Sequence, residues 1–118
     1  MYASLLTKKD IVAFNQKIGE SGNFNNEGSL DFALSIAKTK NNWLYELSYL
    51  TRSLLVDHVF NDGNKRTSLL IIAYYCDQKK NTFDKNRLLF AIKRIAKNNI
   101  NNPTIIMRLI YNAIREKN

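Results

Sequence analysis

The chain has only one cysteine, one proline and one histidine among its 118 residues. A lone cysteine cannot form an internal disulfide, so Cys76 is predicted to be a buried thiol of a protein in a reducing compartment. The apolar runs are far shorter than the ~20 residues that cross a bilayer. The first residues also lack the basic and apolar regions of a signal peptide. We therefore expect a cytoplasmic protein without a membrane partner.

Positive charge is concentrated in one half of the chain. Residues 61–118 hold twelve Lys or Arg and four Asp or Glu, whereas residues 1–60 hold six of each, and the formal net charge is +8. Such a field favours an anionic partner, which is a nucleotide, a nucleic acid or an acidic protein, although many of these lysines also fit a plain solvated surface. The 45% hydrophobic content predicts one globular domain over residues 1–118.

Apolar residues recur at helical spacing along most of the chain, and strand-like alternation is scarce. The sequence therefore predicts a single compact all-α domain of about six helices. The expected helices start at a capping box of Thr7 and Asp10, near Ser29, after Asn41 or Asn42, at Lys65, after the N-cap Asp84 and at Asn102-Pro103, and the last carries Ile106 to Ile114.

The segment 57–67 contains several side chains that can take part in a chemical reaction. It contains His58, and its turn at 62–64 leads into a helix that begins with Lys65 and Arg66. Helix N-termini and glycine turns bind phosphate through backbone N–H groups, and a nearby carboxylate can hold Mg²⁺. A histidine can accept a proton from an attacking hydroxyl. The segment predicts phosphoryl or nucleotidyl transfer; the alternative is a structural histidine beside a common turn and a surface Lys-Arg pair.

The same residues resemble the motif of the Fic family. In that motif histidine, phenylalanine, an acidic residue, Gly-Asn and arginine follow one another in this order. The similarity is greatest to the Doc branch, the death-on-curing toxins, which share the run Lys65-Arg66-Thr67. The length and the helix order also resemble a minimal Doc protein. The matching residues are His58, Phe60, Asp62, Gly63, Asn64 and Arg66.

The resemblance also bears on whether a phosphoryl group or AMP is transferred. Two positions are relevant to this choice. Fic proteins that transfer AMP usually have glycine in place of Lys65 and a further arginine in place of Leu69. The Doc type has lysine at the first of these positions and resembles a kinase, but it commonly has alanine in place of Gly63. The expected reaction is transfer of the γ-phosphoryl group of ATP to a protein Ser or Thr hydroxyl, which would block an essential process such as translation. The alternative is AMPylation of such a hydroxyl.

The resemblance implies a role for each matching residue. His58 would be the general base, Phe60 would anchor the loop in the core, and Asp62 would hold Mg²⁺ between the phosphates of ATP. Gly63 and Asn64 would form an anion hole, and Lys65 and Arg66 would contact phosphates. A flap that pairs with the target by strand addition, with a short β-hairpin, would consist of Gly22, Asn23, Phe24, Asn25 and Asn26.

The family's inhibitory motif, [S/T]xxxE[G/N], does not occur in the sequence. We therefore expect a separate antitoxin protein as a partner. Two further hypotheses are a non-catalytic nucleic-acid module, suggested by the basic residues from Lys79 to Lys97, and a degenerate Fic fold that only binds proteins. Charge alone is weak support for nucleic acid, which is the less favoured partner.

Overall fold

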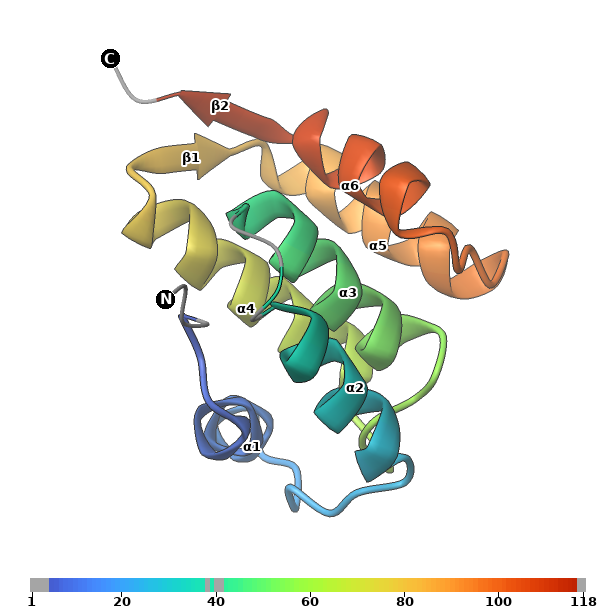
Figure 1. Ribbon diagram of the computed structural model, residues 1–118. Helices are drawn as coiled ribbons and strands as arrows, with labels where there is room; N and C mark the ends of the chain where they lie inside the picture. The colour runs from blue at the N-terminus through green and yellow to red at the C-terminus, as the bar shows by residue number, and fades with distance from the viewer. Residues whose placement is uncertain (1–4, 38, 40–41, 117–118) are drawn as a thin grey trace.

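The computed structural model describes residues 5–37, 39 and 42–116, which form six helices and one two-stranded antiparallel sheet (Figure 1). The expected all-α class with about six helices is confirmed. No helix within these ranges is long and apolar enough to cross a membrane. The elements are α1 (Lys8–Lys17), α2 (Glu27–Ala37), α3 (Trp43–Leu55), α4 (Asn64–Gln78), β1 (Asn81–Phe83), α5 (Lys85–Lys97), α6 (Pro103–Tyr111) and β2 (Ile114–Glu116).

The helix starts follow the capping signals of the sequence. The Thr7 hydroxyl accepts a hydrogen bond from the backbone N–H of Asp10 at 3.2 Å, and the Asp10 carboxylate accepts one from the N–H of Thr7 at 2.9 Å. This reciprocal pair is the expected capping box. Asn42, Asp84 and Asn102 cap α3, α5 and α6 with their side-chain oxygens; Asn41, the other expected cap, lies outside the described residues.

Helix α3 lies at the centre of the fold and packs against α2, α4 and α6 (Figure 1). Its inner face contributes Leu47, Leu50, Leu54 and Leu55, each at most 1% exposed. Burying one such side chain contributes about 1.5–3 kcal/mol. Cys76 of α4 is also buried, as predicted, and burial raises the pKa of its thiol to about 11. The ends of α3 and α4 that meet at the candidate site are therefore fixed by the core.

The two-stranded sheet closes the end of the molecule opposite α1 (Figure 1). Strand β1 pairs antiparallel with β2, with Phe83 opposite Ile114, and the N–H of Asp84 donates to the carbonyl of Ala113 at 2.7 Å. The prediction that the last helix carries Ile114 was wrong, because α6 ends at Tyr111 and this pairing draws the following residues into a strand. The hairpin expected at the flap is replaced by one isolated bridge, between Phe24 and Phe60.

Candidate active site

The connection between α3 and α4 carries His58 in a left-handed backbone conformation, with φ of 54°. This conformation costs a non-glycine residue roughly 1–2 kcal/mol. The side-chain amide of Asn25 donates to the carbonyl of His58 at 3.0 Å, and the N–H of Val59 donates to the carbonyl of Ser53 at 3.2 Å. The imidazole itself is exposed. Strain held in place by its surroundings and attached to an exposed histidine is typical of a functional position.

Phe60 fixes the middle of this connection in the core. Its side chain is 1% exposed and stacks on the ring of Phe24, with 5.4 Å between the ring centroids. The Asn64 side chain accepts a hydrogen bond from the N–H of Phe60 at 3.1 Å and donates one to its carbonyl at 2.9 Å. The side chain of Asn64 therefore closes the loop, a role that the sequence did not indicate, and its backbone N–H is the group left to face an anion.

Gly63 precedes α4 as its N-cap residue and has a left-handed conformation, with φ of 80°. A Cβ atom at this position would lie 2.7 Å from Cγ of Glu20 and 3.0 Å from Cδ1 of Ile18. Glycine is thus required both by the backbone and by the close approach of the segment after α1. No side chain of a described residue caps α4. The first N–H groups of a helix have no partner within it, so this end of α4 carries open donors and a partial positive charge.

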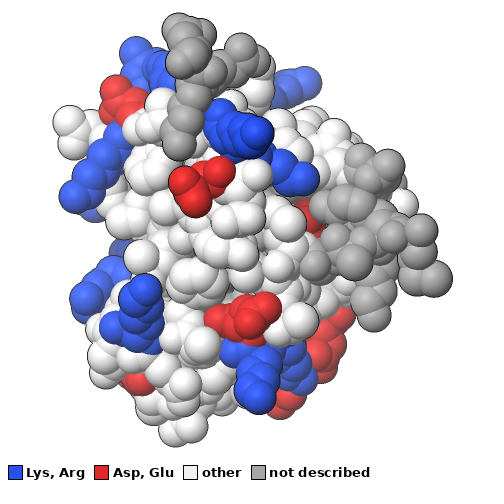
Figure 2. Space-filling model, turned by 90° about the vertical axis from the view of Figure 1, so that its left-hand side faces the viewer, with Lys and Arg blue, Asp and Glu red and all other residues white. Residues whose placement is uncertain are grey.

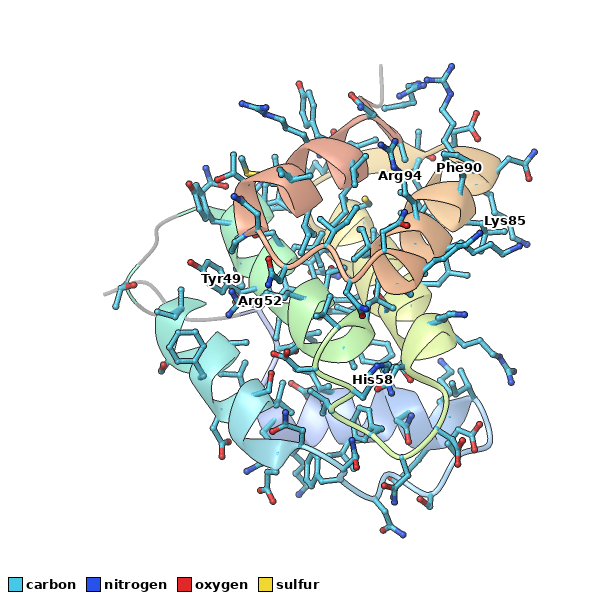
Figure 3. The ribbon with its side chains drawn as sticks, turned by 90° about the vertical axis from the view of Figure 1, so that its right-hand side faces the viewer. Tyr49, Arg52, His58, Lys85, Phe90 and Arg94 are labelled. Atoms are coloured by element: carbon cyan, nitrogen blue, oxygen red, sulfur yellow. The ribbon has the colours of Figure 1, made fainter. Side chains whose placement is uncertain are left out.

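A pocket of about 380 Å³ opens at this helix start. Figure 3 shows His58 at the connection that borders it, between α3 and α4. Leu55 of α3 and Ala96 of α5 provide apolar wall. The polar wall brings together six residues that the sequence assigned to the site, namely His58, Asp62, Gly63, Asn64, Lys65 and Arg66.

The pocket is lined by more positive than negative side chains. Lys65 and Arg66 are exposed, and neither forms an ion pair with any residue that the structure describes. Asp62 is the only carboxylate among the lining residues that the structure describes. Within the described ranges no three acidic, histidine or cysteine side chains gather around a point where a metal ion could sit. Because Mg²⁺ in nucleotide sites is commonly held by one or two carboxylates together with substrate phosphates and water, one aspartate fits this ion only when phosphates complete the shell.

The predicted flap residues lie against the loop that carries His58. The N–H groups of Asn25 and Asn26 donate to the carbonyl of Val59 at 2.7 and 3.0 Å, and the N–H of Asn61 donates to the carbonyl of Asn23 at 3.1 Å. These bonds flank the bridge between Phe24 and Phe60. In an antiparallel pair of this type the N–H and carbonyl of the bridging residue point away from the partner strand. Phe24 therefore presents an open backbone edge.

Asn15 of α1 is a site residue that sequence reasoning missed. Its side chain is 1% exposed and its oxygen accepts a hydrogen bond from the N–H of Gly22 at 2.9 Å. Its amide nitrogen donates to the carbonyl of Asp62 at 3.0 Å and to the hydroxyl of Thr67 at 3.1 Å. The sequence feature that could have revealed it is its position four residues after Ile11, which places this asparagine on the buried face of the helix. One buried amide thus joins the flap, the turn and α4.

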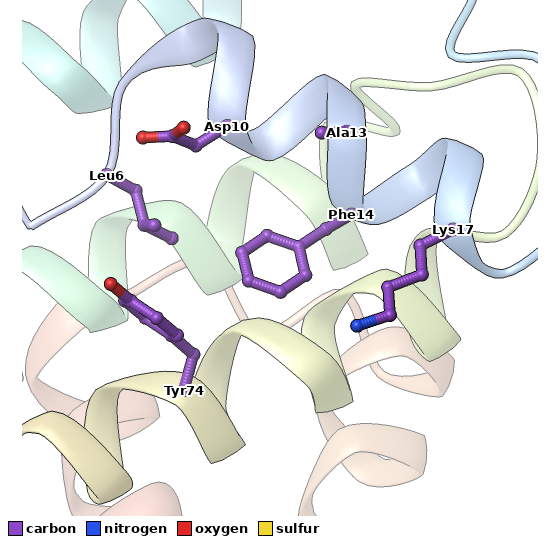
Figure 4. A pocket seen from close by; sticks show the side chains of 6 residues that line it. All are labelled: Leu6, Asp10, Ala13, Phe14, Lys17 and Tyr74. Carbon is purple, nitrogen blue, oxygen red and sulfur yellow. The ribbon is translucent and has the colours of Figure 1, made fainter.

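A second pocket, of about 250 Å³, lies between α1 and α4 (Figure 4). Leu6, Phe14 and Tyr74 line it, and the rings of Phe14 and Tyr74 meet edge to face with 5.7 Å between centroids. Asp10 and Lys17 are the charged residues of its wall. It contains none of the residues predicted from the motif, so the candidate active site is the pocket at the start of α4.

Comparison with known proteins identifies no relative of the chain. No protein-family model, no curated protein and no solved structure matches the chain significantly. The functional interpretation consequently depends on the motif and on the geometry of the pocket.

Proposed function

We propose that the protein transfers the γ-phosphoryl group of ATP to a Ser or Thr hydroxyl of another protein, as the Doc branch of the Fic family does. One observation carries the proposal: a single pocket of about 380 Å³ holds a histidine, a carboxylate and two cations around an uncapped helix start. A pocket of this volume lies within the range of small-molecule sites. Phosphoryl transfer needs mainly positioning and charge neutralisation, which these groups supply.

His58 acts as the general base in this proposal. Its imidazole takes the proton of the target hydroxyl as the oxygen attacks the γ-phosphorus, and the bond from that phosphorus to the bridging oxygen of ADP breaks. The products are a phosphorylated side chain, ADP and a protonated imidazole, which returns its proton to water. The exposure of His58 supports this role, because the target hydroxyl arrives from solvent.

The start of α4 receives the nucleotide phosphates. Backbone N–H groups of its first turn donate to the phosphate oxygens, and the side chains of Lys65 and Arg66 neutralise charge that develops in the transition state. Asp62 would hold Mg²⁺, and the ion would supply further neutralisation of the phosphate charge. The absence of ion-pair partners for Lys65 and Arg66 among the described residues supports this assignment, because both cations are available for an anion.

The target segment is proposed to bind at the flap. The outward N–H and carbonyl of Phe24 can accept one strand of an extended peptide. Asn25 connects the flap to the carbonyl of His58 at 3.0 Å, so a peptide on this edge lies beside the imidazole. A separate antitoxin protein that blocks this site is part of the same proposal.

AMPylation is the alternative reaction, and its support in the sequence was the glycine at position 63. The left-handed φ of Gly63 and the lack of room for a Cβ beside Glu20 give this glycine a structural reason. Its presence therefore no longer favours nucleotidyl transfer. Lys65 remains the residue that favours the phosphoryl reaction.

Radiolabelled ATP distinguishes these reactions. The purified protein, Mg²⁺ and a bacterial lysate are incubated with ATP labelled at either the α- or the γ-phosphate, and labelled proteins are separated on a gel. We expect a labelled band from γ-labelled ATP alone. Label from the α-phosphate would replace the proposal with AMPylation, and no label from either would overturn both.

Matched variants connect the label to the pocket. His58→Ala and Lys65→Ala should each reduce labelling by at least about a hundredfold, in the range of losing a general base or a charge-stabilising donor. Lys79→Ala is the control, because Lys79 is an exposed lysine at the opposite end of α4. Unchanged labelling by folded His58→Ala protein would exclude the mechanism.

A further inference from the structure

Helices α5 and α6 form a positively charged surface. Between Asp84 and Glu116 the sequence has no acidic residue. The face with α1 and α4, in contrast, mixes Lys and Arg with Asp and Glu (Figure 2), and Lys8 there pairs with Glu27 and Asp31. Seven basic residues occupy the α5–α6 region, all exposed and none in an ion pair with a described residue: Lys85, Arg87, Lys93, Arg94, Lys97, Arg108 and Arg115.

A groove of about 350 Å³ lies between these two helices. Phe90 of α5 lines it and is 67% exposed, although it is one of the largest apolar side chains. Arg87 and Arg94 stand three residues before and four residues after Phe90, so all three lie on one side of the helix. Figure 3 shows Phe90 and Arg94 on α5, far from His58. Leu109 and Ala113 provide apolar wall from the side of α6.

The groove continues into a second hollow of about 440 Å³. Arg87 and Asn112 line both hollows, and the second one extends to Arg115 and to Tyr111, which is 60% exposed. The combined surface thus offers an apolar centre with guanidinium groups around it.

This combination identifies the chemistry of a partner. Arginine pairs with carboxylates through two parallel hydrogen bonds, and an exposed aromatic ring beside an apolar wall suits an apolar side chain of a protein. A nucleic-acid backbone would use the cations but would leave the partly exposed side chain of Leu109 without a contact, so a protein segment fits better. We propose that the α5–α6 groove binds an acidic protein segment, which inserts an apolar side chain beside Phe90 and places carboxylates at Arg87 and Arg94.

A library of random twelve-residue peptides displayed on phage tests this proposal with the whole chain as bait. We expect the selected peptides to carry an aromatic or large aliphatic residue with Asp or Glu three or four residues away. A synthetic copy of the best peptide should bind, by fluorescence anisotropy, at least about tenfold more weakly to Phe90→Ser, Arg87→Glu and Arg94→Glu, because each change removes a contact or reverses a charge.

Lys93→Glu is the matched control. Lys93 is exposed on α5 but does not line the groove, so its reversal should weaken binding by less than about threefold. Failure to select acidic peptides, or equal binding by Arg94→Glu and wild type, would overturn the proposal. Tight binding of a 24-base-pair DNA duplex that all three charge reversals weaken alike would assign the surface to nucleic acid instead. The His58→Ala protein should bind the peptide normally, so this result is independent of the proposed transferase activity.

Discussion

The side-chain oxygen of Asn15 accepts a hydrogen bond from the backbone N–H of Gly22 at 2.9 Å, and this bond ties the flap to α1. The nitrogen of the same amide donates to the carbonyl of Asp62 and to the hydroxyl of Thr67. The flap and the turn before α4 thereby share one buried support. A change in this side chain must affect both segments together.

Asn15→Ala should lower the free energy of unfolding by about 1–3 kcal/mol, because it leaves buried polar groups without partners. Urea unfolding measures the loss. Amide hydrogen exchange should also become faster at Gly22, whose N–H loses its acceptor. Lys9→Ala, at an exposed position of the same helix, is the control and should change neither quantity. Unaltered exchange at Gly22 in the Asn15 variant would contradict the role assigned to this amide.

His58→Gly should make the protein more stable while it removes the proposed transferase activity. Glycine adopts the left-handed conformation freely, so the change relieves strain of roughly 1 kcal/mol. Thermal unfolding measures the gain and the γ-label assay measures the loss. Lys80 also has a positive φ, of 59°, and Lys80→Gly should raise stability equally with labelling intact. A less stable His58→Gly protein would show that the imidazole holds the loop.

Substitution of two glycines distinguishes the stability cost of backbone strain from that of steric crowding. Both Gly63 and Gly19 have positive φ, but a Cβ at Gly19 meets no atom of the described residues within 4 Å. Gly19→Ala should cost about 1–2 kcal/mol from strain alone. Gly63→Ala should cost about 1–3 kcal/mol more, because its Cβ collides with the Glu20 side chain. Denaturant midpoints measure both, and equal losses would mean that Glu20 moves aside.

The buried thiol of Cys76 gives a prediction about pH. Burial raises its pKa from 9.0 to about 11, so the folded protein retains this proton over a range in which the unfolded chain loses it. Stability should therefore be intact below pH 9 and should fall as the pH rises toward 11. Comparing urea midpoints of wild type and Cys76→Ala at pH 8 and pH 10 isolates the effect. A thiol reagent should react slowly at pH 8 until urea is added.

The features that sequence reasoning found are local ones. Capping by Thr7 and Asp84 depends on residues three positions away, and the polar wall of the pocket comes from one continuous segment, 58–66. The features that it missed join distant segments. Asn15 reaches Thr67, 52 positions away, and Ile114 pairs with Phe83. A helical spacing of apolar residues does not reveal that its last member has a strand partner elsewhere.

The pairing of β1 with β2 also bears on the order of folding. These strands enclose α5 and α6 between them in the sequence, and joining the ends of so long a loop carries an entropic cost of about 3 kcal/mol. Each helix can form earlier from neighbouring residues, within about a microsecond. We expect the strands to meet last, after α5 and α6 have docked on α3. Residue 114 would then report the final step of folding, and a fluorescent label there should respond more slowly than helix formation followed by circular dichroism.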